Sequence, residues 1–195
     1  EYVEYNIEED EYGKLIYLFE TFLCKACDKN DIDIVKCLLN LDNIDVNKYN
    51  PKNGNTPLII AVCNQNIEIV KLLLMNPNIN VNHKNFEQEN AFDIAYKKKY
   101  NSIIEVLINN DKFDQDLTFL NHIQDRSLIK IFIQSKHFNA NCYDISLLKE
   151  AIRNKDNEII DILIDKLSIS NNIKNINEAA FLSIKYNSIE TFKKL

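Results

Sequence analysis

The sequence predicts an all-α solenoid, in which helix-turn-helix repeats stack in a row and are joined by short extended or β-hairpin fingers. One pattern occurs twice, 35 positions apart, with Thr21 and Ala26 in the first copy and Thr56 and Ala61 in the second. A fixed period of this size is typical of stacked repeats. Within each copy, apolar residues recur every three or four positions, as on one face of a helix. Two glycines and three prolines are too few for the tight turns of a β-sandwich or barrel.

The first element is expected to be an acidic leader that runs into a capping helix, together residues 1–19. Residues 1–20 hold seven acidic residues and one base, so subtraction from the totals (29 and 23) leaves 22 acids and 22 bases in the remainder. An apolar stripe at helical spacing predicts a lengthened first helix or cap over residues 12–28, because the ends of a repeat array need a polar outer face. Residues 1–10 are expected to be mobile.

The second copy of the pattern shows how one repeat should fold. Thr56 stands where a helix N-cap is expected, and Pro57 follows at the first helical position, where its missing N–H costs nothing. Residues 58–62 and 67–74 have the apolar spacing of two short amphipathic helices. Residues 78–82 alternate between polar and apolar, which predicts a short extended finger.

These residues carry a resemblance to a known family. The motif reads Gly54-Asn55-Thr56-Pro57-Leu58-x-x-Ala61, followed by Glu68-Ile69-Val70-Lys71-Leu72-Leu73-Leu74. It closely resembles the ankyrin repeat, a family that stacks helix–loop–helix–β-hairpin units of about 33 residues. Ile59 stands at the family's usual histidine, so the hydrogen bond which that histidine makes between repeats is expected to be lost.

Further copies are expected along the rest of the chain. Asn90 replaces the capping threonine in the third copy and keeps its chemistry. The step to the fourth copy is only 25 residues, which predicts a lost finger between Ile108 and Leu117 and a shortened first helix over residues 115–125. The later copies are identified by their second helix. One array over residues 20–195 is expected, with repeats at about 20–54, 55–88, 89–114, 115–144, 145–176 and a partial 177–195.

No reaction chemistry is predicted, and the chain is not expected to be an enzyme. Cys24-x-x-Cys27 has a metal-like spacing, and Cys37 could approach it from the second helix, but no histidine completes a four-ligand zinc site. The thiols are expected to be small buried apolar groups. His83, His122 and His137 are scattered, and glycines are too rare for a phosphate-binding loop. No catalytic, cofactor-binding or metal-binding residue is therefore predicted.

Cysteine usage and hydropathy predict a cytoplasmic, reducing environment. Five cysteines is an odd number without the spacing of a disulfide framework. The sequence contains neither a signal peptide nor the 18 or so apolar residues of a membrane span. Because the chain begins with Glu1 and ends at Leu195 within a helical pattern, it is expected to be a piece of a longer protein.

The resemblance implies that a partner would lie along the concave groove formed by the fingers and the first helices. Mapped onto this chain, the candidate partner-binding residues are Lys29, Lys48, Tyr49, Lys52, Asn53, Asn64, Lys84, Phe86, Lys97, Lys98, His122, Arg153 and Tyr186. Basic and aromatic groups together suit an acidic peptide or an acidic patch on another protein. The predicted function is therefore a protein–protein interaction module, a scaffold or adaptor, and a monomer is expected.

Several alternatives stay open at this point. Composition bias could place lysine at any exposed position and so mimic a basic groove. The groove could bind the acidic leader of its own or a neighbouring chain. The segment could instead regulate or target a longer enzyme or a host-directed effector whose active part lies outside it. Neither nucleic acid nor a membrane is expected as a partner, because the array is electrically balanced and the leader is acidic.

Overall fold

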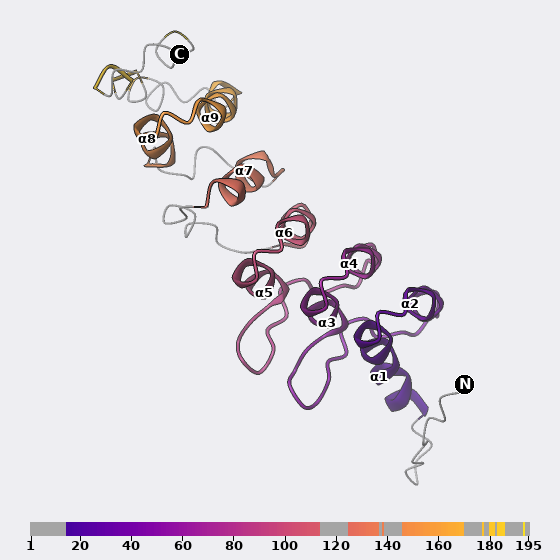
Figure 1. Ribbon diagram of the computed structural model, residues 1–195. Helices are drawn as coiled ribbons and strands as arrows, with labels where there is room; N and C mark the ends of the chain where they lie inside the picture. The colour runs from indigo at the N-terminus through magenta and orange to yellow at the C-terminus, as the bar shows by residue number, and fades with distance from the viewer. Residues whose placement is uncertain are drawn as a thin grey trace. The chain divides into compact units, whose positions relative to one another are not determined.

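The computed structural model describes residues 15–113, 125–136, 138, 146–169, 177, 180, 181, 183–185 and 193. In these residues the ordered elements are helices joined by turns, and no strand is present. Figure 1 shows nine labelled helices in this described part of the chain. The predicted all-α fold is therefore confirmed, and the described fingers are turn-rich loops rather than paired strands.

The chain divides into two compact units, Glu1–Asp114 and Gln115–Leu195. The helices of the N-terminal unit are α1 (Leu15–Asp28), α2 (Ile32–Leu39), α3 (Pro57–Cys63), α4 (Ile67–Leu74), α5 (Ala91–Lys97) and α6 (Asn101–Ile108). Those of the C-terminal unit are α7 (Arg126–Gln134), α8 (Ser146–Arg153) and α9 (Asn157–Ile169).

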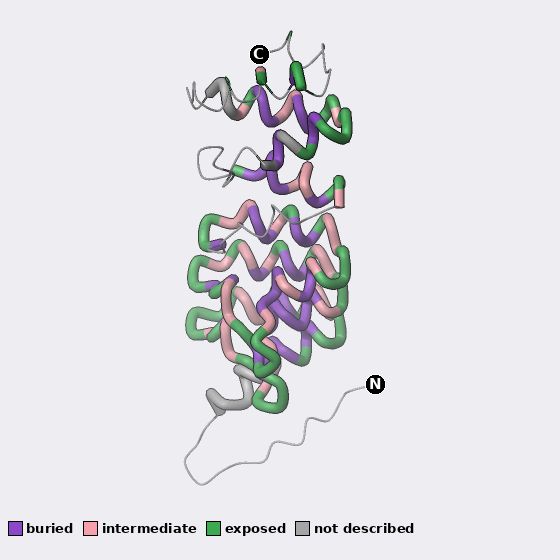
Figure 2. The backbone as a smooth tube through the Cα atoms, turned by 90° about the vertical axis from the view of Figure 1, so that its left-hand side faces the viewer, coloured by how far each residue is buried: buried purple, intermediate pink, exposed green. Residues whose placement is uncertain are grey.

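The N-terminal unit consists of three stacked helix pairs. The first helices α1, α3 and α5 contact each other in order, and the second helices α2, α4 and α6 form a parallel row. Two long loops, residues 40–56 and 75–90, join successive pairs and project past the first helices (Figure 1). In Figure 2 purple marks the buried backbone inside this unit, and the exposed turns at its edges are green. This arrangement is the expected solenoid.

Local capping fixes where the first helices begin. The hydroxyl oxygen of Thr56 accepts a hydrogen bond from the backbone N–H of Ile59 at 3.3 Å, and Pro57 opens α3. In α5, the side chain of Asn90 accepts from the N–H of Asp93, whose carboxylate in turn accepts from the N–H of Asn90. This reciprocal capping box satisfies two amides that the helix leaves unpaired. Both predicted N-caps are confirmed.

The turn inside each pair has the same geometry. Asn30, Gln65 and Lys99 each follow a first helix with φ of 56°, 57° and 58°. The next residue donates its N–H to the helix carbonyl five positions earlier, as Asn66 does to Ala61 at 3.0 Å. In the C-terminal unit, Lys155 has φ of 55° between α8 and α9. The α8–α9 pair therefore has the same turn as the three pairs of the N-terminal unit.

Asparagine side chains join one repeat to the next at the base of the fingers. The amide of Asn47 donates to the carbonyl of Asn78 at 2.7 Å and accepts from the N–H of Asn80 at 2.7 Å. One repeat later, the amide of Asn82 donates to the carbonyl of Lys112 at 2.7 Å. These contacts satisfy backbone groups in irregular loops, which have no helical partner.

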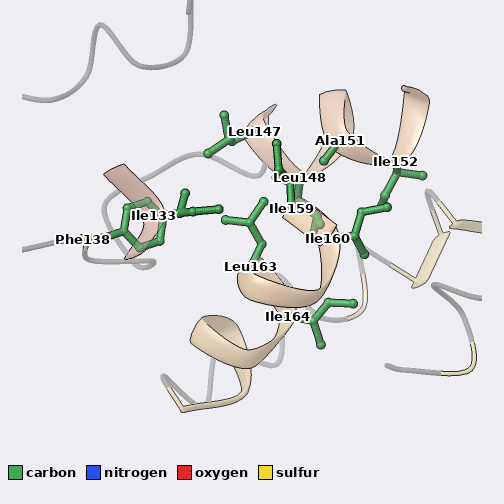
Figure 3. Packing of buried hydrophobic residues seen from close by; sticks show 10 residues of the cluster. All are labelled: Ile133, Phe138, Leu147, Leu148, Ala151, Ile152, Ile159, Ile160, Leu163 and Ile164. Atoms are coloured by element: carbon green, nitrogen blue, oxygen red, sulfur yellow. The ribbon is translucent and has the colours of Figure 1, made fainter. Parts of the chain in front are cut away.

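The C-terminal unit has a core of its own. Figure 3 shows side chains from α7, α8 and α9 meeting in one cluster, and Ile133, Leu148 and Ile160 are each at most 2 % exposed. On the surface, the guanidinium of Arg126 pairs with Asp156, which directly precedes α9, and it donates a second bond to the same carboxylate at 2.8 Å. The ion pair ties α7 to the start of α9.

Several expected features lie outside the described residues. These are the mobile leader, the shortened first helix over residues 115–125 and most of the segment in which a finger should be missing. The described turn after α6 runs as far as Phe113, whose ring packs edge-on against Phe92 at 5.3 Å. The boundaries of the expected repeats remain predictions.

Candidate partner-binding surface

The two fingers are compact loops closed by their own backbone. In finger 1 (residues 48–55), the N–H of Asn50 donates to the carbonyl of Asn55 at 2.9 Å, and Gly54 has φ of +75°. In finger 2 (residues 83–89), the N–H of Asn85 donates to the carbonyl of Glu89 at 3.0 Å. The fingers are therefore shaped by internal hydrogen bonds.

Finger 2 is also bonded directly to finger 1. The N–H of Phe86 donates to the carbonyl of Asn53 at 3.1 Å, and the amide of Asn85 donates to the side-chain oxygen of Asn55 at 2.9 Å. The Nε2 of His83 lies 3.1 Å from the carbonyl of Gly54, which can only accept, so Nε2 carries the proton in this contact. Because three bonds cross between the loops, the fingers present one connected surface.

Aromatic rings pack together beside these bonds and remain exposed to solvent. The rings of Tyr49 and His83 stack at 5.5 Å, and Phe86 meets Tyr49 edge-on at 6.0 Å. Tyr49 is nevertheless 42 % exposed and Phe86 59 % exposed. We call the three aromatic residues and the two neighbouring lysines the finger surface. It consists of Tyr49, Lys52, His83, Lys84 and Phe86.

A hollow of about 420 Å³ lies between α1, α3 and finger 1. Its lining residues are Cys24, Lys25, Asp28, Asn50, Pro51, Lys52, Asn53, Asn55, Ile60, Cys63 and Asn64. The apolar residues of the lining include Ile60 and Pro51, and Lys52 and Asn53 are exposed. Three of the candidate partner-binding residues, Lys52, Asn53 and Asn64, line this hollow, which is called the groove below. Binding of a partner there stays a prediction.

The charges around the groove are mixed, with an excess of unpaired lysines. Among the described residues, Lys29, Lys52, Lys84 and Lys98 are exposed and form no ion pair. Lys97 differs, because its Nζ lies 3.2 Å from Glu89 and that pair is internally neutralised. Burial raises the pKa of the Cys63 thiol; Lys98 lowers it, and Glu89 and Glu87 raise it further. Both signs of charge therefore act on this end of the groove.

Some candidate residues also hold the scaffold together. The amide of Asn64 donates to the carbonyls of Cys27 and Asp28 at 3.1 and 3.2 Å, so it caps the end of α1 from the neighbouring repeat. The carbonyl of Lys48 accepts from the Cys24 thiol at 3.3 Å. Arg153 is exposed on α8 in the C-terminal unit. His122 and Tyr186 lie outside the described residues.

The thiols are placed for packing. Cys24 and Cys27 are at most 5 % exposed, and burial raises the pKa of each to about 12, with Cys24 adding to the shift of Cys27. They therefore stay protonated at neutral pH. Cys37 is exposed on α2, so the suggestion that it approaches the other two is wrong. The part of the chain that the structure describes contains no cluster of three metal-ligating side chains.

The parts of this surface that depend on contacts between repeats are not predicted by the sequence. Cys24, Lys25 and Ile60 line the hollow although they were not candidates. Lys25 and Ile60 occupy the same repeat position, 35 residues apart, so the period itself could have identified them. No comparable signal exists for the contact of His83 with Gly54, because it joins residues of different fingers.

The helices described here share one further property. None of them combines the length and the apolar character needed to cross a lipid bilayer.

Comparison with known proteins agrees with the geometry of stacked pairs and projecting fingers. A family model of ankyrin repeats, which spans three copies of the repeat, matches residues 3–85 and residues 23–121. The two matches together cover more than half of the chain. The protein therefore belongs to the ankyrin repeat family, whose members are generally protein-interaction modules and typically non-catalytic.

One solved structure shows a similar fold at low sequence identity. The crystal structure of the ankyrin repeat protein EF0377 has a TM-score of 0.50 and 20% identity, and the match covers 88% of this chain and 94% of that one. A chain in the structure of Bd0816, a predatory endopeptidase from Bdellovibrio bacteriovorus, in complex with immunity protein Bd3460, has a TM-score of 0.46 and 23% identity over 88% of this chain and 95% of that one. No curated protein matches.

Proposed function

We propose that the protein is a non-catalytic interaction module that binds an acidic peptide, or an acidic patch on a partner protein, along the fingers and groove of its N-terminal unit. The observation that carries this proposal is the finger surface itself. Tyr49 and Phe86 are exposed there although both are held in place by ring contacts and, for Phe86, by a backbone bond to the neighbouring finger.

Exposed but ordered aromatic rings favour binding because little freedom is lost when a partner covers them. Aromatic side chains are enriched among the residues that carry most of the binding energy at protein interfaces. A surface that is already fixed in shape also avoids part of the ordering cost of association. The three bonds between the fingers supply that order here.

The unpaired lysines give the surface its preference for acidic partners. Four exposed lysines without an ion pair lie on this face: Lys29, Lys52, Lys84 and Lys98. They outnumber the two exposed acids there that form no ion pair with a described residue, Asp28 and Glu87. Complementary charge raises association rates and rejects wrongly charged partners more than it adds affinity. The excess is modest, which favours an acidic peptide over a nucleic acid, whose binding depends on a strongly basic face.

The remaining parts of the proposal follow from side-chain chemistry. Burial raises the pKa of the Cys24 and Cys63 thiols that line the groove, which makes them poor nucleophiles at neutral pH. Four unpaired cysteines among the described residues suit a reducing cytoplasm. Monomeric behaviour in solution is part of the same proposal.

A peptide selection tests the proposal without knowledge of the natural partner. A random peptide library is selected on the full chain, on the double variant Lys29→Glu/Lys98→Glu and on the control Lys36→Glu/Lys71→Glu. The control changes the same charge on the second helices, where Lys36 makes only an exposed ion pair with Glu68 at 3.3 Å. We expect acid-rich peptides with an aromatic residue from the wild type and the control, and weaker enrichment from the groove variant.

The same variants then serve in a pull-down from native cells, with circular dichroism to verify that each is folded. The proposal requires partners that the control captures and the groove variant loses. Peptides without acidic enrichment, or equal capture by all three proteins, would remove the groove from consideration. Strong salt-dependent retention on an immobilised polyanion would point to nucleic acid instead.

A further inference from the structure

The most distinctive charged segment of the chain is the acidic leader, and the finger surface is complementary to it. Residues 1–11 carry six carboxylates and no base, together with Tyr2 and Tyr5. We propose that this segment docks on the finger surface of the same chain, with carboxylates facing Lys52 and Lys84 and a tyrosine packed against the rings of Tyr49 and Phe86.

The repeat register puts the leader on the correct side of the molecule. At the 35-residue period, residues 15–20 of α1 correspond to residues 50–55, which form finger 1 in the next repeat. The extra first turns of α1 therefore occupy the place of a finger, and in Figure 1 this helix begins on the side to which the finger loops project. The start of α1, to which the leader is joined, therefore lies on that side.

The distance is well within reach of the leader. The thiol of Cys24 donates to the carbonyl of Lys48, at the base of finger 1, at 3.3 Å. Leu15 lies nine residues before Cys24, a helical rise of about 14 Å. The 14 residues before Leu15 span up to about 46 Å when extended. A tether that is longer than the gap makes docking intramolecular and gives it an effective concentration on the order of millimolar.

The finger surface has exposed lysines and aromatic rings for contact with the leader. Lys52 and Lys84 are exposed, and neither forms an ion pair with a described residue. Glu87 is an exposed acid on finger 2. Phe86 exposes 59 % of its surface and Tyr49 exposes 42 %. Aromatic rings with adjacent lysines match a segment in which two tyrosines each follow a glutamate and four acids come after them.

A second open surface among the described residues is the outer face of the first repeat, where Ile34 is 44 % exposed. Its equivalents Ile69 and Ile103 are 0 % and 2 % exposed, because a preceding repeat covers them. This face is bordered by the exposed or half-exposed carboxylates of Asp31 and Asp33. Like charges repel an acidic leader from the outer face, so the charge distribution favours the fingers.

Docking would make the leader a built-in competitor for acidic ligands. This competition rests on the proposed function, since it requires that partners use the same surface, whereas the docking itself does not. Exposed charge pairs are screened by salt over a distance of about 8 Å at physiological ionic strength. The contact should therefore be reversible and weaken as salt is added.

A single tryptophan can report on the leader in the full chain, because the natural sequence contains none. The variant Tyr5→Trp is compared with a free peptide of residues 1–14 that carries the same substitution. We expect blue-shifted emission and acrylamide quenching that is roughly twofold weaker in the chain than in the peptide, with the difference lost in high salt.

Matched charge variants decide where the leader lies. In the Tyr5→Trp chain, Lys52→Glu/Lys84→Glu should restore peptide-like quenching, and Lys36→Glu/Lys71→Glu should leave the protection intact. Circular dichroism controls for folding. Peptide-like quenching in the unaltered chain overturns the proposal, as does protection that survives the finger variant. Protection that depends on protein concentration overturns the same-chain contact. Failure of the peptide selection would leave this result unaffected.

Discussion

At the scale of single residues, the joined fingers depend on the lack of a side chain at Gly54. Its φ of +75° lies in the left-handed region, which other residues adopt only with strain. An added Cβ would lie 2.6 Å from Cδ1 of Phe86 and 2.9 Å from the backbone nitrogen of Phe86. That nitrogen donates to Asn53, so backbone as well as ring would have to move.

We expect Gly54→Ala to lower the free energy of unfolding by about 1–3 kcal/mol, because the strain and the clash act together. Urea unfolding followed by circular dichroism measures the change. The control is Gln88→Gly, at the equivalent place in finger 2, where φ is 63°. It should stabilise the protein by about 0.5–1 kcal/mol, since glycine relieves the strain. Equal midpoints for Gly54→Ala and the wild type would contradict this account.

Residue-level prediction from sequence succeeds where the interaction is local. Thr56 and Asn90 act on amides three positions away, so the cap can be identified from neighbouring residues. Asn64 was assigned to the partner-binding surface, yet its amide caps a helix 36 residues earlier in the chain. That role depends on how two repeats stack, which no local pattern contains. The exposure of Tyr49 and Phe86 agrees with their predicted place on the fingers.

At the scale of helices, how much an apolar residue contributes to stability depends on whether another repeat covers it. Ile34 on α2 and Ile69 on α4 occupy the same position of successive repeats, but their exposed fractions are 44 % and 0 %. The apolar spacing of the two helices is nearly identical, and sequence alone therefore predicts equal burial. The difference is a consequence of position in the row.

Substituting each isoleucine with alanine should show this difference. We expect Ile69→Ala to destabilise the protein by about 2–5 kcal/mol, the range for removing a buried large side chain. For Ile34→Ala we expect a loss below about 1 kcal/mol, because much of the side chain is already in water. Thermal and urea unfolding of both variants provide the measurement. Comparable losses would show that the outer face of the first repeat is covered in solution.

The contact between α7 and α9 should give the C-terminal unit a pH-dependent stability. The hydrogen bond from Arg126 holds the pKa of Asp156 below its ordinary value of 3.8. A carboxylate with a depressed pKa stabilises the fold above that ordinary value, and the contribution is lost as the pH falls through the folded pKa. Arg126 is exposed, so the effect is reduced by solvent.

Asp156→Asn isolates the charge, because asparagine can still accept the N–H of Ile159 that Asp156 caps. The variant should be less stable than the wild type at pH 7, and the two should converge as the pH falls below about 4. Hydrogen exchange of the α9 amides at several pH values provides the readout. A difference that stays constant across this range would show that the ion pair contributes nothing.

At the scale of the whole molecule, each compact unit has its own buried core. Leu73 is fully buried in the N-terminal unit, and Leu163 is 4 % exposed in the C-terminal unit. In repeat arrays, stability is a sum of local terms and nearest-neighbour terms, so separate regions can open separately. The sequence predicts one array over residues 20–195 with a lost finger between Ile108 and Leu117, and that finger's loss stays a prediction. The two compact units divide after Asp114, which falls within the same segment.

We expect Leu163→Ala to accelerate hydrogen exchange in α8 and α9 while leaving α3 and α4 unchanged, because the cavity removes about 2–5 kcal/mol from one core. The reciprocal variant Leu73→Ala should affect α3 and α4 alone. Native-state exchange followed by mass spectrometry resolves the two regions. If both variants accelerated exchange everywhere, the chain would open as one cooperative block.

The contacts that hold successive repeats together differ in chemistry from the candidate contacts with a ligand. Asn47 and Asn82 join successive repeats through neutral amides and carbonyls. The candidate ligand contacts, by contrast, involve lysine charges, which salt screens within about 8 Å at physiological ionic strength. Ionic strength can therefore be used as a selective probe of the N-terminal unit. Apart from the exposed Lys36–Glu68 pair between α2 and α4, the contacts of this unit that moderate salt weakens should be those of the lysine-bearing face, while the asparagine contacts between repeats stay constant.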